Sequence, residues 1–256
     1  MNKTELGSID TTIDARGVAT ITFSHPAHNS LPGLLLKKFA EAITEAGENP
    51  EIKVIVIKSD GERTFCAGAS FDELISIKDF ETGKKFFMGF ANLINSMRKC
   101  PKFIIGRVHG KAVGGGVGLA AAMDYCMATK YASIKLSELA VGIGPFVVGP
   151  AVERKMGKAA MTLLAINATE WKTAKWAKNK GLFDELFDEV TYMDDYIDRL
   201  AGKLAASNPE AMRLLKKAFW EEADHWDVLL EKRAEMSGHL VLSDYTVNAI
   251  SEFKNA

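Results

Sequence analysis

Four glycines, Gly114, Gly115, Gly116 and Gly118, fall within five positions of this chain, between an apolar run at 103–108 and an alanine-rich segment. That order predicts a buried strand, a tight turn and the start of a buried helix. Glycines in such a turn remove the Cβ atoms that would keep a ligand from the N–H groups at the helix N-terminus, where negative charge is favoured. A second interpretation is that they only let the helix pack closely on a neighbour.

The same order of elements occurs earlier in the chain. Residues 54–57 are apolar at four successive positions, as in a strand covered on both faces, and a turn containing Gly68 then opens into a helix. The units at 54–74 and 103–123 would each present backbone N–H groups at the start of a helix. Two such turns side by side would aim two donors at one oxygen atom, which is the geometry of an oxyanion hole.

The remaining segments predict an α/β core followed by helices. Alternating residues on either side of 15–17 predict a β-hairpin, and apolar residues at helical spacing predict helices at 34–46 and 86–97. Further short strands are predicted at 125–129 and 132–135, and further helices at 146–156, 158–166, 170–179, 192–206 and 209–222. Because no Pro/Ser-rich linker divides the chain, we expect a core over residues 1–200 that continues into a helical region over residues 201–256.

Charge and composition exclude several classes of partner. The 256 residues include 32 Lys and Arg against 33 Asp and Glu, a formal net charge of −1, and no basic stripe stands out. Neither nucleic acid nor a membrane is therefore expected as a partner. The first seven residues lack the apolar core of a signal peptide, and no uncharged run is long enough to span a bilayer, so a cytoplasmic protein is expected.

Cysteines and histidines do not have the spacing of metal ligands. Cys66, Cys100 and Cys126 lie among apolar neighbours, so buried thiols are expected, with contact between Cys66 and a ligand as the alternative. His25 and His28 fall in a turn for which a solvated position is expected. We therefore predict no metal ion.

Motifs of three other enzyme classes are incomplete or missing. The dinucleotide-binding pattern Gly-x-Gly-x-x-Gly fails because Leu119 stands where the third glycine belongs, and a phosphate-binding loop fails at Ala112. No serine lies in a Gly-x-Ser-x-Gly pattern. The sequence thus gives little support to a dinucleotide site, a phosphate-binding loop or a serine nucleophile.

Glu138 differs from the other acidic residues by its neighbours. It stands between Leu136 and Leu139, and burial among such residues would raise the pKa of the carboxyl group toward that of a useful general base. An acid at a helix N-terminus or an exposed strand end explains the same pattern equally well. Asp72 and Glu73, in contrast, are expected to be first-turn acids favoured by a helix dipole.

With both glycine turns and Glu138 in place, the chain resembles the crotonase superfamily, the enoyl-CoA hydratases and isomerases. The resemblance covers nearly the whole chain and depends on the joint order of His25-Pro26, Asn29-Ser-Leu31, Phe65-Cys-Ala-Gly-Ala69 and His109-Gly-Lys-Ala-Val-Gly-Gly-Gly116. It implies an α/β fold, a crotonase-like spiral of repeated β-β-α units with a helical C-terminal region. It also implies a homotrimer or a dimer of trimers in which residues 201–256 pack between subunits.

The resemblance implies roles for individual residues. Ala69 and Gly115 match the two residues whose N–H groups bind the thioester oxygen, and Glu138 matches the catalytic acid. The substrate is then an acyl-CoA thioester, so that coenzyme A enters as part of the substrate and no separate cofactor is expected. Further residues match positions along the substrate, namely Ala67, Ser70, Phe71, Gly116, Gly118 and Phe146.

One departure from the pattern bears on the reaction. Hydratases of this superfamily carry a second glutamate two residues after the glycine triplet, where this chain has Gly118. Ser70 also replaces a usual Asp, and Phe146 replaces a common glycine and would narrow the acyl pocket. A single carboxylate favours an enoyl-CoA double-bond isomerase in which Glu138 shuttles the proton.

Two other functions stay open. The first is a hydratase, for example of the methylglutaconyl type in branched-chain acyl-CoA catabolism, with the missing acid supplied by Asp72, by Glu73, by a substrate carboxylate or by backbone-held water. The second is a non-catalytic acyl-CoA-binding protein.

The C-terminal region carries an apolar stripe that fits either a subunit interface or the core of its own chain. The stripe consists of Leu214, Leu215, Ala218, Phe219, Trp226, Leu229 and Leu230. Beside it, Lys216 and Lys217 are expected on a solvated helix face, with contact to the phosphates of coenzyme A as the alternative.

Overall fold

The computed structural model describes residues 6–255, so that most of the segment argued not to be a signal peptide lies outside the described residues. The strands are β1 (Ser8–Ile13), β2 (Val18–Ser24), β3 (Val54–Ser59), β4 (Thr64–Cys66), β5 (Phe103–Val108), β6 (Lys111–Val113), β7 (Tyr125–Thr129), β8 (Ser133–Lys135), β9 (Lys172–Thr173) and β10 (Glu185–Phe187). The helices are α1 (Gly33–Glu48), α2 (Phe71–Ser76), α3 (Phe80–Lys99), α4 (Gly115–Ala122), α5 (Gly149–Met156), α6 (Lys158–Ile166), α7 (Ala174–Asn179), α8 (Val190–Ala205), α9 (Pro209–Phe219), α10 (Trp226–Leu240) and α11 (Asp244–Asn255), with 3-10 turns η1 (Glu138–Val141) and η2 (Glu221–Ala223).

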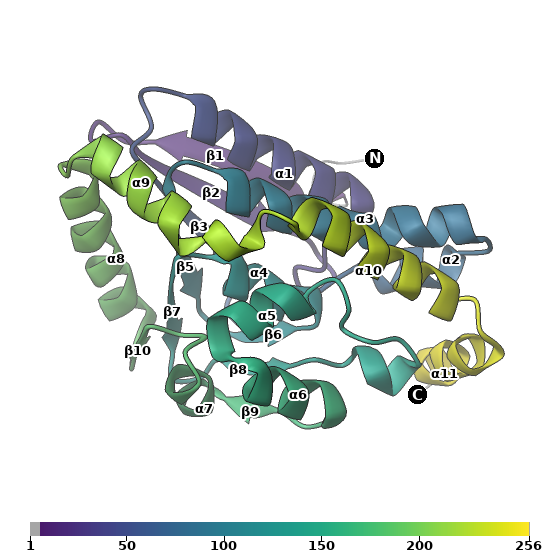
Figure 1. Ribbon diagram of the computed structural model, residues 1–256. Coiled ribbons are helices and arrows are strands. Elements are labelled where there is room, and N and C mark those ends of the chain that lie inside the picture. The colour runs from purple at the N-terminus through teal and green to yellow at the C-terminus, as the bar shows by residue number, and fades with distance from the viewer. Residues whose placement is uncertain (1–5, 256) are drawn as a thin grey trace.

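The strands form two separate sheets, and the chain passes between them in a repeating order. A six-stranded sheet has the order β1-β2-β3-β5-β7-β10, and a four-stranded sheet has the order β4-β6-β8-β9. Successive repeats place one strand in the large sheet and the next in the small sheet before a helical segment follows, as in β3-β4-α2, β5-β6-α4 and β7-β8-η1 (Figure 1). This mixed α/β arrangement confirms the predicted fold class.

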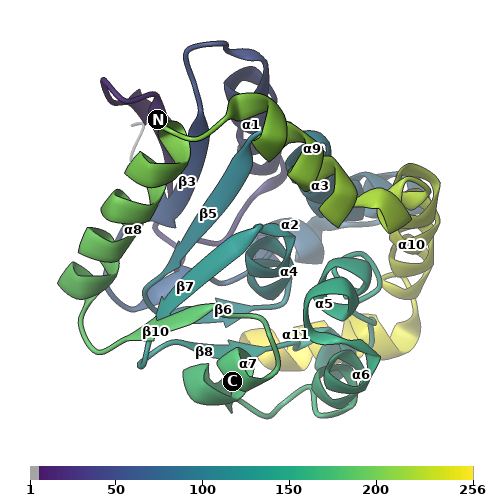
Figure 2. The ribbon, with the colours of Figure 1, turned by 60° about the vertical axis from the view of Figure 1, so that its left-hand side comes forward.

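Helices cover both faces of the large sheet. In β3, alternate residues divide between two clusters, with Ile55 and Ile57 in the main core and Val54 and Val56 in the layer beneath α8. Figure 2 shows α8 along one side of the sheet and α4 and α3 on the other. Because β3 is paired in parallel with β2 and β5 and is buried on both faces, it needs the continuous apolar run seen in its sequence.

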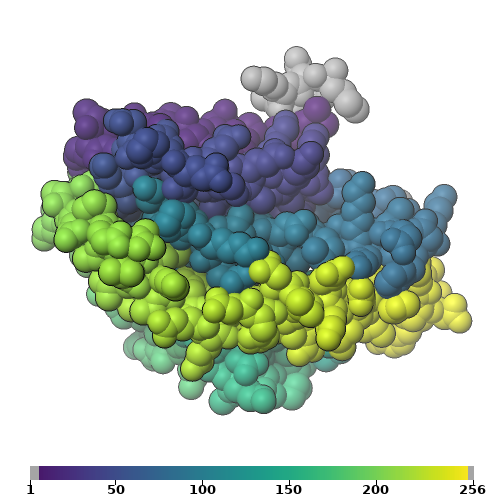
Figure 3. All heavy atoms as spheres, turned by 45° about the horizontal axis from the view of Figure 1, so that its top comes forward, coloured from purple at the N-terminus to yellow at the C-terminus, as the bar shows by residue number. Residues whose placement is uncertain are grey.

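The helix α10 packs along α3 of the same chain. The backbones approach so closely that an ideal Cβ on Gly83 would lie 3.1 Å from the carbonyl oxygen of Gly238. At the other end of the pair, Arg98 forms an ion pair of 2.8 Å with Asp227. The two helices therefore run antiparallel, and Figure 3 shows this C-terminal segment lying against the α3 segment at the surface.

A buried ion pair joins α9 to the core and corrects the prediction for Lys216. Its Nζ lies 2.7 Å from Oδ2 of Asp124 and donates to the carbonyl oxygen of Lys102 at 3.0 Å. The expected solvated position is wrong, because Lys216 is only 2% exposed. Its ammonium group instead neutralises the carboxylate that follows α4. Across residues 6–255, no helix is both long and apolar enough to cross a membrane.

Candidate active site

Three neighbouring strands of the small sheet bring the predicted catalytic groups to one edge. Strands β4, β6 and β8 pair in parallel, so their carboxyl ends lie on the same side. Ala69 follows β4, Gly115 follows β6 and Glu138 follows β8. The repeat of the fold, and not closeness in sequence, therefore brings these three residues together.

The first turn is held by Gly68. Its φ of +89° lies in the left-handed region that favours glycine, and its carbonyl oxygen accepts a hydrogen bond from the N–H of Leu31 at 2.8 Å. An ideal Cβ on Gly68 would lie 3.2 Å from the backbone nitrogen of Gly115. The two glycine turns are thus in direct contact.

The second turn begins α4. Gly114 has a φ of +51°, and its N–H donates to the carbonyl oxygen of Lys135 at 2.9 Å, which ties the end of β6 to the end of β8. Within residues 6–255, neither the N–H of Ala69 nor that of Gly115 donates to a protein acceptor. Both N–H groups could therefore bind an oxygen atom of a ligand, and that of Gly115 lies at the start of α4, where the helix dipole favours negative charge.

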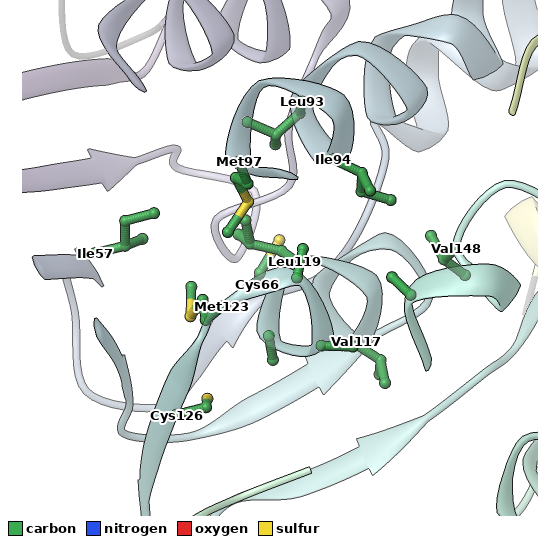
Figure 4. Packing of buried hydrophobic residues seen from close by; sticks show 14 of the residues in the cluster. Ile57, Cys66, Leu93, Ile94, Met97, Val117, Leu119, Met123, Cys126 and Val148 are labelled. Carbon is green, nitrogen blue, oxygen red and sulfur yellow. The ribbon is translucent and has the colours of Figure 1, made fainter. Parts of the chain in front are cut away.

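The other glycines of the stretch also serve close packing. A Cβ on Gly116 would collide with the carbonyl oxygen of Cys66, and one on Gly115 would collide with the ring of Phe90. The interpretation of Gly115 and Gly116 as positions of close packing is therefore confirmed, and their role in a ligand site stays a prediction. Figure 4 shows α4 enclosed among apolar side chains that include Leu93, Ile94 and Val148.

Glu138 is the first residue of η1, and its carboxylate lies against Gly114. An ideal Cβ on Gly114 would be 3.0 Å from Oε1, so the carboxylate occupies space that any other residue there would fill. Its Oε2 is buried without a hydrogen-bond partner. Burial raises the pKa of Glu138 from an ordinary value of 4.5 to about 7, opposed in part by a hydrogen bond from its own backbone N–H.

The surroundings of Glu138 bear on the alternatives predicted for it. It does stand at the start of a short helical turn, but its carboxylate is neither exposed nor fully hydrogen-bonded. A carboxylate with a pKa near 7 is half ionised at neutral pH, so it both accepts and returns a proton. Beside two free N–H groups, it forms a site suited to removing a proton next to a carbonyl group.

The residues after the first turn mainly cap and form the start of α2. Ser70 is the N-cap, where its Oγ accepts a hydrogen bond from the N–H of Glu73 at 3.3 Å. Asp72 and Glu73 are first-turn acids, which confirms their predicted placement. Glu73 also accepts a hydrogen bond from the N–H of Gly33 at 2.8 Å, and Phe71 packs in an apolar cluster at the C-terminal end of η1.

The remaining predicted substrate contacts lie in two places. Ala67 is half-buried, and its N–H donates to the carbonyl oxygen of His28 at 3.2 Å, beside the first turn. Phe146 is half-buried on the loop after η1, where its ring folds over Gly144 and the guanidinium of Arg233 lies 6.0 Å from the ring centroid.

Gly118 is covered by a residue that sequence reasoning missed. An ideal Cβ at this position would lie 2.5 Å from Cγ1 and 2.6 Å from Cβ of Val148, which precedes α5. No local signal in the sequence marks Val148, because it is one apolar residue in an apolar loop.

The cysteines and histidines take other roles. All three cysteines are buried and free, and Sγ of Cys66 accepts a hydrogen bond from the N–H of Gly68 at 3.4 Å. The His25 ring bonds to Oγ of Ser30 at 3.1 Å. In the part of the chain that the structure describes, no group of His, Cys, Asp and Glu is arranged to hold a metal ion.

The sequence matches the enoyl-CoA hydratase/isomerase family over residues 14–246, so the chain belongs to this family and to the crotonase superfamily. A probable enoyl-CoA hydratase of Bacillus subtilis (strain 168) is 27% identical over 237 residues, which are 92% of this chain and 92% of that protein. A peroxisomal Delta(3,5)-Delta(2,4)-dienoyl-CoA isomerase of Arabidopsis thaliana is 26% identical over 208 residues, 75% of this chain and 73% of that protein.

The fold is shared with solved structures. A putative enoyl-CoA hydratase from Mycobacterium avium paratuberculosis K-10 has a TM-score of 0.87 at 23% identity, covering 97% of this chain and 96% of that one. The family contains several kinds of enzyme, so the particular reaction has to be argued from the site.

Proposed function

We propose that the protein is an enoyl-CoA double-bond isomerase in which Glu138 is the only proton-transferring residue. The observation that carries the proposal is one buried carboxylate with a raised pKa beside the free N–H groups of Ala69 and Gly115. Coenzyme A enters as part of the thioester substrate.

The reaction needs only these groups. Glu138 removes a proton from C2 of a 3-enoyl thioester, and the electron pair moves onto the carbonyl oxygen to form a dienolate. The N–H groups of Ala69 and Gly115 stabilise that oxygen, and losing one such donor commonly lowers the rate by about 10²–10³-fold. The same carboxyl group then returns the proton at C4, which leaves the double bond between C2 and C3.

The positions of the acids suggested for a second role support isomerisation over hydration. Adding water in the usual way needs a second acid or base to hold and deprotonate it. Gly118 supplies none, Asp72 is exposed on α2, and Glu73 is occupied by the backbone of Gly33. Of the acids suggested as replacements, none therefore shares the buried position of Glu138.

Hydration of a carboxylated enoyl-CoA is the second candidate, and Arg233 favours it. This half-buried arginine lies over Phe146, and no carboxylate among residues 6–255 forms an ion pair with it. A carboxylate at the far end of a branched acyl group, as in a methylglutaconyl substrate, would pair with that guanidinium. The Bacillus subtilis relative is itself described as a probable hydratase.

Proton exchange distinguishes these functions. The protein is incubated in D₂O with a 3-enoyl-CoA, and deuterium at C2 and C4 is followed by mass spectrometry together with the conjugated product. An isomerase gives conjugated product, with label at C4 where the transferred proton exchanges with solvent. The Glu138→Gln variant abolishes both signals, whereas Glu153→Gln, at an exposed acid on α5, leaves them unchanged.

Other outcomes would overturn the proposal. Loss of the conjugated absorbance of a 2-enoyl-CoA, without any isomerisation, would establish hydration. Binding of acyl-CoA with no turnover of either substrate would leave the non-catalytic function.

We also propose that the chain assembles as a homotrimer or a dimer of trimers through α9. Leu214, Leu215 and Phe219 are 50%, 49% and 54% exposed, so this half of the predicted stripe is only partly covered by its own chain, although the ring of Phe219 stacks on that of Phe103. Trp226 and Leu230, in the other half, are 5% and 0% exposed and belong to the core.

A further inference from the structure

We propose that Val148 is a specificity-determining residue that closes the side of the reaction space next to Glu138, so that water does not reach the acyl carbons. The inference deepens the proposed isomerase function and depends on it. Val148 and Gly118 form a pair in this role, in which the valine side chain stands where a side chain on residue 118 would be.

The first turn of α4 relates the position of Val148 to that of Glu138. The N–H of Gly118 donates to the carbonyl oxygen of Gly114 at 3.3 Å, so these two residues are one helical turn apart, ~6 Å along the axis. The space next to Gly114 is filled by the carboxylate of Glu138, and the space next to Gly118 is filled by Val148. A carboxylate and an isopropyl group therefore flank the turn that carries the donor of Gly115.

The valine cannot easily move aside. A Cβ on Gly118 would collide with Cγ1 and Cβ of Val148, and because Cβ is bonded directly to the backbone, a change of rotamer alone cannot remove the collision. Val148 is 4% exposed, and its carbonyl oxygen accepts the N–H of Val152 at 3.1 Å in the first turn of α5. This position is fixed by the packing of α5 on α4, which Figure 4 shows from close by.

An apolar side chain at this position favours isomerisation of the substrate over its hydration. Hydration joins the oxygen of water to C3 and a proton to C2, and it needs a group that orients the water and accepts its proton. The side chain of Val148 has no polar atom to hold a water molecule, and it fills the space next to Gly118. The dienolate is then left with one reaction, which is return of the proton by Glu138.

The test compares the two reactions in variants of the full-length protein. Val148→Ala shortens the wall, and Val152→Ala, the same change at a buried residue one turn further along α5, is the matched control. Each protein is given a short-chain 2-enoyl-CoA in H₂¹⁸O, and ¹⁸O at C3 of the 3-hydroxyacyl product is measured. Isomerisation of a 3-enoyl-CoA is measured in parallel.

We expect Val148→Ala to raise the ratio of hydration to isomerisation by about tenfold, and Val152→Ala to leave it unchanged. Gly118→Glu alone should lose isomerase activity without gaining hydration, because its side chain collides with Val148. The double variant Gly118→Glu/Val148→Gly should hydrate faster than either single variant. A non-additive gain of this kind is the signature of a shared space.

Two results would contradict the proposal, and they differ. If the wild-type protein isomerises but Val148→Ala leaves the ratio unchanged and the double variant does not exceed Gly118→Glu, only the role of Val148 is refuted. If the wild-type protein hydrates and does not isomerise, the proposed function itself is wrong, and the role of Val148 falls with it.

Discussion

The burial of Glu138 has a consequence for stability that can be measured apart from activity. Its carboxylate has no partner at Oε2 and its pKa is raised to about 7 from an ordinary value of 4.5. The folded protein therefore binds a proton on Glu138 over a pH range in which the unfolded chain has lost it. Replacing Glu138 by glutamine removes this titration while keeping the size of the side chain.

The sign and magnitude follow from linkage. Between pH 4.5 and 7 the folded state holds more protons on this group than the unfolded state, so stability falls as the pH rises. A shift of this size corresponds to about 3 kcal/mol, at roughly 1.4 kcal/mol per pKa unit. Below pH 4.5, the pKa of the unfolded chain, the contribution of Glu138 to the free energy of unfolding does not change with pH. Above about pH 7, the pKa in the folded protein, the loss of stability is complete.

Urea denaturation at fixed protein concentration measures the effect. The free energy of unfolding is determined for the wild type and for Glu138→Gln from about pH 4 to 8.5. The difference between them cancels the titration of every other group. We expect the variant to gain about 3 kcal/mol relative to the wild type across this range, while its isomerase activity is lost. The wild-type kcat/KM should rise with pH up to about 7 and then level off.

The refuting result is a difference in stability that does not depend on pH. If the two proteins differ by the same amount at each pH within about 0.5 kcal/mol, Glu138 has an ordinary pKa and the argument from burial is wrong. Glu153→Gln, at an exposed acid, serves as the control and should show no such dependence.

Two further predictions concern the C-terminal region. Lys216→Met leaves Asp124 buried without its counter-charge, and we expect it to lower the free energy of unfolding by about 3–5 kcal/mol in urea denaturation. A loss below about 1 kcal/mol would contradict the role of this ion pair. Leu215→Lys should convert the proposed assembly to smaller species, as measured by size-exclusion chromatography with light scattering. Ile13→Lys, at a residue that is likewise 49% exposed, is the control and should leave the assembly intact. Equal behaviour of the two variants would contradict an interface at α9.

The arrangement of the strands could be predicted where a repeat or a period is present. The hairpin of β1 and β2, the long helices α1 and α3 and the buried strands β3 and β5 carry clear patterns, and all are found. Of the strands of two or three residues, β8 was predicted, whereas β4, β6, β9 and β10 were missed, because segments of this length contain almost no period; β9 lies within the predicted helix 170–179, which begins only at Ala174. Their pairing is imposed by the sheets that they join.

The site could be predicted in part for a similar reason. Glycine turns and an acid among apolar residues are local signals, and the repeat of the fold brings Ala69, Gly115 and Glu138 to one edge. The burial of Lys216 depends on Asp124, which lies 92 residues earlier in the chain, and the covering of Gly118 depends on Val148. Such contacts between distant segments have no local signal, so only the packed structure reveals them.

The C-terminal helix also bears on the site, through a small apolar cluster. Phe71 of α2, Ile143 beyond η1 and Ile250 of α11 pack together, and Thr246 of α11 lies directly against Gly142, which ends η1. Because α2 follows the proposed donor Ala69 and η1 begins with the proposed base Glu138, one cluster packs against the segments that carry both residues. The predicted division at residue 200 separates the α/β core from the helical region, but these contacts cross it. The residues after it therefore help to set the distance between base and donor, on which the proposed proton transfer depends.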